Sequence, residues 1–144
     1  MNKLQFSVLI NATKEKVWAT LWEDNTFRDW SNLIDEGSYM VGELKEGNEI
    51  QFISGSSGYG VTSLVDKLAP KEFVLFRHKA DTKDSGQKER ADEWTGGSES
   101  YLLSEANGVT TLTVNIDVPP EQEELFKNIF PKALGRIKTL AEKS

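Results

Sequence analysis

The chain contains a single histidine, His78, and no other side chain has an ordinary pKa so close to neutrality. In the alternation of a strand, His78 shares a face with Val74 and Phe76. If that face lines a cavity, His78 could polarise a ligand carbonyl or act as a general acid-base, with Glu93 or Glu99 as its orienting partner. A lone histidine without a defined nucleophile seldom makes a catalytic site, so the pattern favours a hydrogen-bonded histidine near a strand end.

Aromatic residues offer a second kind of candidate site. Trp94 stands alone in polar sequence just before two glycines. It could close a pocket as a lid, anchor a protein partner, or merely seal the edge of the core. Other aromatic side chains are possible cavity groups, although large aromatics in a small domain are more often core residues; these are Trp30, Tyr39, Tyr59 and Tyr101.

The sequence contains segments that resemble phosphate- or metal-binding motifs, but the residues around them do not support either function. The glycine-rich residues 55–60 are followed by a strand pattern instead of a helix, which predicts a hairpin turn and not a phosphate loop. The absence of cysteine excludes thiolate nucleophiles and sulfur-based zinc sites. Five carboxylates lack the spacing of a calcium loop and are explained better as a solvated loop, namely Asp81, Asp84, Glu89, Asp92 and Glu93. We expect no metal and no cofactor.

Length and charge narrow the class of protein. The 144 residues predict one domain, 1–144. Twenty-three acidic against seventeen basic residues give a net charge of -6, which disfavours nucleic acid as a partner. No apolar stretch approaches the ~20 residues of a membrane-spanning helix, so we expect no membrane insertion. The first residues show no signal-peptide pattern, and with the lack of cysteine this predicts a cytoplasmic protein.

Hydrophobic periodicity predicts the elements around these residues. An alternating strand at 3–10 precedes a helix capped by Thr13 and a second short helix that starts at Asp24 or Asn25. The charged segment 80–97 predicts a mobile hairpin loop, too polar to bury. The other predicted strands are separated by turns, at 38–43, 49–54, 59–68, 73–79, 98–105 and 109–118.

The segment 120–144 predicts a long amphipathic helix. Its apolar positions recur at helical spacing from Leu125 to Ala141. Pro131 removes the hydrogen bond to the carbonyl of Lys127 and predicts a kink. Gly135 leaves room one turn later, and we expect the two together, on the buried side, to keep a cavity open. The predicted fold class is therefore α+β: a seven-stranded, curved antiparallel sheet wrapped around this helix, with two short helices between strands 1 and 2.

This order of elements resembles the START-like superfamily, also called SRPBCC or helix-grip. More narrowly, the chain is similar to the bacterial branch related to the activator of the heat-shock protein 90 ATPase. The resemblance covers nearly the whole chain and rests on residues 10–18, 27–30, 36–38, 46–52, 108–114 and 130–140.

The resemblance implies a hydrophobic cavity between the sheet and the last helix. Iron of the ring-hydroxylase type is excluded, because one histidine cannot supply its ligands. The leading hypothesis is binding of a small apolar or amphipathic molecule without catalysis. The alternatives are a co-chaperone-like module that binds a chaperone or another protein, and a cyclase-like enzyme using His78. The predicted cavity residues are Trp30, Phe52, Phe76, His78, Trp94, Tyr101, Phe126, Ile129, Phe130 and Leu134.

Overall fold

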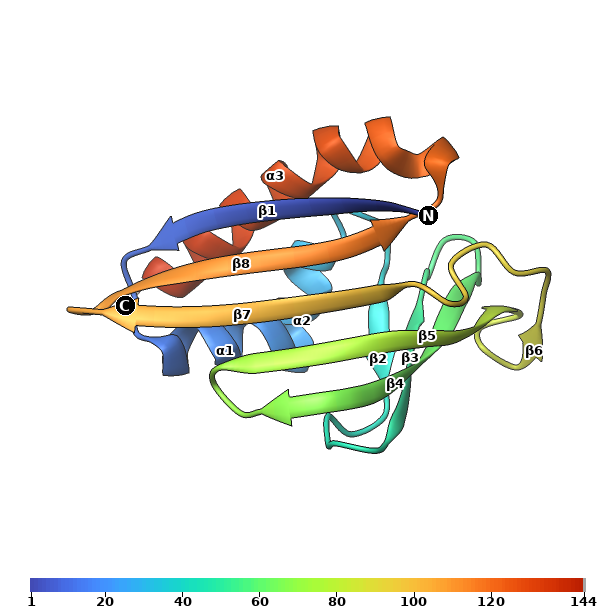
Figure 1. Cartoon of the computed structure of the whole chain (residues 1–144), viewed down its shortest axis with the longest axis horizontal. Coiled ribbons are helices and arrows are strands. Elements are labelled where there is room, and N and C mark those ends of the chain that lie inside the picture. The colour runs from blue at the N-terminus through green and yellow to red at the C-terminus, as the bar shows by residue number, and fades with distance from the viewer. Residues whose placement is uncertain (144) are drawn as a thin grey trace.

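A computed structural model describes residues 1–143 (Figure 1). Strand β1 leads into two short helices, and the chain then forms seven further strands before a 3-10 turn and the long last helix. The bounds are β1 Asn2–Ile10, α1 Lys14–Trp22, α2 Asp24–Ser31, β2 Tyr39–Val41, β3 Glu49–Ile53, β4 Gly60–Ala69, β5 Phe73–Lys83, β6 Lys88–Glu89, β7 Ser98–Ala106, β8 Val109–Val118, η1 Pro120–Gln122 and α3 Glu123–Glu142.

Seven of the strands form one antiparallel sheet in the order β1-β8-β7-β5-β4-β3-β2, and the two-residue β6 pairs with the end of β5. Strand β4 carries two register shifts against β5, at Thr62/Ser63 and Val65/Lys67. Such bulges bend a strand and increase its twist. The sheet is therefore curved, and the three α-helices lie on one side of it (Figure 1). The predicted helix-grip fold is confirmed, including the two short helices between β1 and β2.

The short helices are held by local polar contacts and by apolar packing. Thr13 caps α1, as predicted, by accepting a hydrogen bond of 3.2 Å from the backbone N–H of Lys16. Trp30 of α2 donates its indole N–H to the carbonyl of Leu21 at 3.2 Å. This bond satisfies the one polar atom of a buried indole, so Trp30 fixes α2 against the end of α1.

Helix α3 packs its apolar stripe onto β1 and the short helices. Phe130 is buried and stacks on Phe6 with ring centroids 5.0 Å apart. Arg136 makes a two-pronged contact with Asp29 of α2, with N···O distances of 2.7 and 2.9 Å. These contacts close the helices over the concave side of the sheet.

Two predictions for α3 are wrong. Pro131 and Gly135 lie on the exposed side, and nothing lies within 4 Å of a Cβ built on Gly135. Both positions lie more than about 100° around the helix from the centre of the buried stripe, so they do not hold the cavity open. Leu125, predicted in the stripe, is 49% exposed.

Candidate functional site

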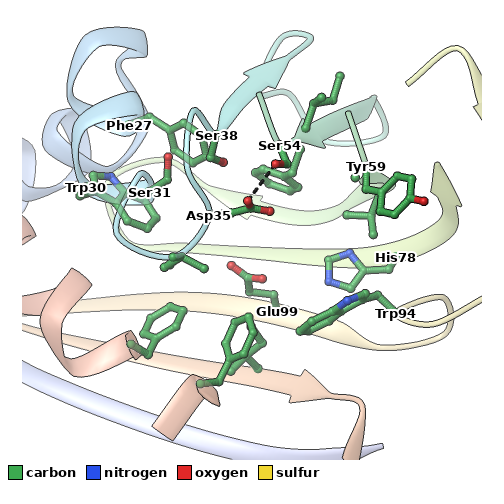
Figure 2. Close-up of a pocket in the computed structure, with 18 of the residues that line it drawn as sticks. Phe27, Trp30, Ser31, Asp35, Ser38, Ser54, Tyr59, His78, Trp94 and Glu99 are labelled. Atoms are coloured by element: carbon green, nitrogen blue, oxygen red, sulfur yellow. Dashed lines mark hydrogen bonds between the residues drawn. The ribbon is translucent and has the colours of Figure 1, made fainter. Parts of the chain in front are cut away.

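A cavity of about 200 Å³ lies between the curved sheet, α2 and the first half of α3 (Figure 2). Its walls are mainly aromatic and aliphatic, with a few polar side chains among them. An apolar cavity of roughly 150 Å³ is large enough to bind benzene in another protein, so this space suits a small molecule. It is lined by Phe27, Trp30, Ser31, Ile34, Asp35, Ser38, Phe52, Ile53, Ser54, Tyr59, Gly60, Val61, His78, Arg90, Trp94, Glu99, Tyr101, Ile116, Phe126 and Phe130.

Some of the predicted cavity residues line this space and others do not. Those on its wall are Trp30, Phe52, His78, Trp94, Tyr101, Phe126 and Phe130. Three others do not line it. Phe76 is fully buried against Phe52 and Trp22, Leu134 is buried in the core, and Ile129 is only partly buried on α3. Ligand contact by the lining residues stays a prediction.

Several polar groups on the wall were missed by the sequence analysis: Ser31, Asp35, Ser38, Ser54 and Arg90. A signal was present for two of them. Phe27, Trp30 and Ile34 recur at helical spacing, and Ser31 and Asp35 fall within the same face. Polar residues in an otherwise apolar helical face indicate a cavity wall or a polar contact inside the core. In the structure, Asp35 accepts a hydrogen bond of 2.8 Å from Ser54 at the exposed rim.

Glu99 is the carboxylate that faces the interior of the cavity (Figure 2). In the sheet it pairs with Phe76 on one side and Ile116 on the other, so it stands within an inward-facing apolar row. Its side chain is partly buried and lines the cavity. Burial raises the pKa of Glu99 to about 6, and the hydrogen bond that Tyr101 donates to it lowers the pKa by less. Strand alternation with Tyr101 and Leu103 was the available sequence signal.

His78 lies beside Trp94 on the same cavity wall (Figure 2). Its Nδ1 shares a hydrogen bond of 2.7 Å with the hydroxyl of Ser63. His78 is thus a hydrogen-bonded histidine, the reading that the sequence favoured. The carboxylates considered as its orienting partners bond elsewhere: Glu93 contacts Arg90 and Gln122, and Glu99 accepts from Tyr101.

Burial lowers the pKa of His78 to about 4, and nearby Asp81 and Asp117 offset only part of that effect. The imidazole is consequently neutral at pH 7. Ser63 is fully buried and does not line the cavity, so its hydroxyl is not placed to attack a ligand.

Asp81 contradicts the prediction of a solvated carboxylate, because its side chain is 0% exposed. Its carboxylate accepts hydrogen bonds from the backbone N–H groups of Glu93, Trp94 and Thr95 at 2.9–3.1 Å, and from the Thr95 hydroxyl at 2.7 Å. Arg90 adds an ion pair at 3.3 Å. Burial raises the pKa of Asp81, but these hydrogen bonds lower it by more. Asp81 thus holds the 90–97 segment in place.

The anchored segment brings Trp94 against the cavity. The centroid of the Trp94 ring lies 5.2 Å from that of the Phe126 ring on α3 and 6.4 Å from that of the His78 ring. At the rim, the guanidinium of Arg90 lies over the half-exposed ring of Tyr59, 4.6 Å from its centroid. Trp94 therefore forms part of the cavity wall, and its roles as a lid, a partner anchor or a seal at the core edge stay predictions.

Residues 1–143 contain neither a metal-binding cluster nor a membrane-spanning helix. Within that part of the chain, no group of three or more His, Asp or Glu side chains is placed to hold a metal ion. None of the described helices is long and apolar enough to cross a bilayer.

Comparison with solved structures supports the fold. No protein-family model and no curated protein matches the sequence. DynU16, from the dynemicin biosynthetic locus, is similar with a TM-score of 0.72 and 16% identity over 99% of this chain. The chain spans about half of DynU16, 48% of its length.

Two further solved structures align with this chain over the full length of both proteins. They are protein CV1439 from Chromobacterium violaceum, with a TM-score of 0.71 and 18% identity, and the Aha1 dimer from Colwellia psychrerythraea, with 0.69 and 18%. At such identities the likeness shows the helix-grip fold, and function must be argued from the site.

Proposed function

We propose that this protein binds a small, largely apolar molecule with one polar group in the cavity beneath α3. The observation that carries the proposal is an aromatic cavity of about 200 Å³ with polar groups on its wall. Binding sites for small molecules commonly combine apolar walls with a few polar groups that set orientation. The fold likeness to DynU16, a protein from a biosynthetic locus, is consistent with a small-molecule role.

A cavity-filling variant tests this proposal. Val61 lines the cavity, so Val61→Phe should occupy part of it. Val41→Phe is a matched control, because Val41 is 46% exposed and does not line this cavity. We expect benzyl alcohol and hexanol to stabilise the unaltered protein and the control in a thermal-shift assay, but not Val61→Phe. Native mass spectrometry should show the same ranking. Absence of stabilisation by any apolar probe would contradict the proposal.

A protein-interaction module of the heat-shock ATPase activator type is the second candidate function. The full-length fold likeness to the Aha1 dimer favours it, as does the resemblance to the bacterial branch of that family. On the outer face of the sheet, Leu9 is 63% exposed and Leu102 46% exposed, which leaves apolar side chains free for a partner.

A pull-down with the chaperone of the source cell, followed by an ATPase assay, tests this function. The double variant Leu9→Ser/Leu102→Ser should lose the interaction, whereas Val61→Phe should retain it. The opposite ranking would exclude the outer face as the binding surface.

A further inference from the structure

The charges on the cavity wall are unequal. Glu99 faces the interior and Asp35 stands at the rim of the same space (Figure 2). Arg90 is the one basic residue on the wall, and its guanidinium is already engaged by Asp81, Glu93 and the carbonyl of Thr82 at 3.1–3.3 Å. An anionic ligand would meet an inner carboxylate and no free cation. A cationic ligand would meet carboxylates without a cationic partner.

An unpaired hydroxyl provides an independent indication of a polar ligand group. Ser31 lines the cavity, is 4% exposed, and its Oγ has no hydrogen-bond partner among residues 1–143. Buried polar atoms are nearly always paired, and leaving one unpaired costs roughly 1–3 kcal/mol. Among residues 1–143, Glu99 accepts a side-chain hydrogen bond from the hydroxyl of Tyr101, and this bond goes to Oε2 and not to Oε1. Ser31 and Oε1 of Glu99 thus have acceptor capacity that a donor group could use.

The aromatic walls favour the same class of ligand. Phe27, Trp30 and Tyr101 line the same cavity as Glu99 and Ser31, and their rings pack in sequence, with centroids 5.2 Å apart for Phe27 and Trp30 and 6.4 Å apart for Trp30 and Tyr101. The face of an aromatic ring attracts an organic cation, and more strongly where water is excluded. His78 does not oppose a cation, because it is neutral near pH 7.

We propose that the ligand is a small primary amine with an aromatic or alkyl body, bound as an ammonium ion that donates to Glu99 and Ser31. The inference rests on the proposed function and specifies its ligand class. The rings enclose the apolar body, and the carboxylate inside the cavity selects charge. The titratable and charged groups that share the cavity wall with Glu99 are Asp35, Tyr59, His78, Arg90 and Tyr101.

Three probes of nearly equal shape test the inference: 2-phenylethylamine, 2-phenylethanol and 3-phenylpropionate. In calorimetric titrations at pH 8, the amine should bind about tenfold more tightly than the alcohol, since a charge-assisted hydrogen bond exceeds a neutral one by about that factor. The carboxylate probe should bind least. At pH 6 the amine should also release protons on binding, because ammonium contact favours the ionised form of Glu99, whose pKa is about 6. Proton release is read from titrations in buffers of different ionisation enthalpy.

Glu99→Gln should lower the affinity for the amine about tenfold and change that for the alcohol much less. Glu43→Gln, on an exposed residue outside the cavity, is the matched control and should leave both unchanged. Equal affinity for amine and alcohol, or an unchanged preference in Glu99→Gln, would overturn the amine inference while leaving the proposed function intact. If none of the probes binds, the proposed function fails as well.

Discussion

Replacing Glu99 by Gln should make the folded protein more stable at neutral and alkaline pH. The amide has nearly the size of the carboxylate and keeps an oxygen that can accept from the Tyr101 hydroxyl. The substitution removes a charge from an apolar row of the sheet, between Phe76 and Ile116. Burial without a cationic partner destabilises the ionised form.

The size and the pH dependence follow from the pKa of Glu99, which burial raises from 4.5 to about 6. One pKa unit corresponds to about 1.4 kcal/mol, so the ionised carboxylate destabilises the fold by up to about 2 kcal/mol. Because the side chain of Glu99 is only partly buried, solvent screening reduces this figure. Between pH 4.5 and 6 the folded state binds more protons than the unfolded state, so stability falls as the pH rises through that window. This destabilisation by the ionised Glu99 carboxylate is complete well above pH 6 and absent well below pH 4.5.

Urea unfolding followed by tryptophan fluorescence measures the effect. The free energy of unfolding should be about 1–2 kcal/mol higher for Glu99→Gln than for the unaltered protein at pH 8, and about equal at pH 4. His78 has the opposite pH dependence, since burial lowers its pKa to about 4 and disfavours its charged form as the pH falls. That contribution is common to both proteins and cancels in the difference.

Glu43→Gln provides the control for loss of an exposed carboxylate and should change stability by less than about 0.5 kcal/mol. A variant of Glu99 that is less stable than the unaltered protein at pH 8, or a difference that does not vary with pH, would refute the reasoning. Either result would mean that the carboxylate is better solvated in the cavity than its place in the sheet indicates.

Three other predictions concern the anchored loop, the last helix and the histidine. Asp81→Asn should lower the free energy of unfolding by about 3–5 kcal/mol. The stability that it removes is present above the usual Asp pKa and is lost as the pH falls. The control Asp84→Asn, at an exposed residue of the same hairpin, should have little effect, and equal effects of the two variants in denaturant unfolding would contradict the role of Asp81 as an anchor. Pro131→Ala should raise the free energy of unfolding by about 1–3 kcal/mol, because Pro131 lies inside α3 and has no backbone N–H to donate to the helix. Binding of the probes should be unchanged, because Pro131 is exposed, and Lys132→Ala is the control for a substitution at the neighbouring exposed position. The Hε1 resonance of His78 should titrate with a pKa of about 4 in NMR spectra, and a midpoint near 6.5 would show that the ring is solvated.

Much of the fold could be predicted because the evidence for it is periodic and local. The alternation in β1, β7 and β8 and the helical spacing in α3 each set which side chains face the core. The helix phase alone also places Pro131 and Gly135 away from the stripe that contains Phe130 and Leu134, so their exposure was readable from the sequence. The inward phase of Glu99, which alternates with Tyr101 and Leu103, was readable too, and Glu105 has the same phase but lies at the exposed end of the strand.

The sequence by itself determined the elements, their order and the side that each presents to the core, since these depend on short-range spacing. Only the tertiary structure decided which groups meet in the cavity. Asp81 looks solvated in the sequence, yet a loop twelve to fourteen residues away folds back to satisfy its carboxylate. Ser31 of α2 and Glu99 of β7 come from distant segments and line one cavity because the sheet curves around α2 and α3. Burial and charge pairing depend on these long-range contacts, which no local pattern records.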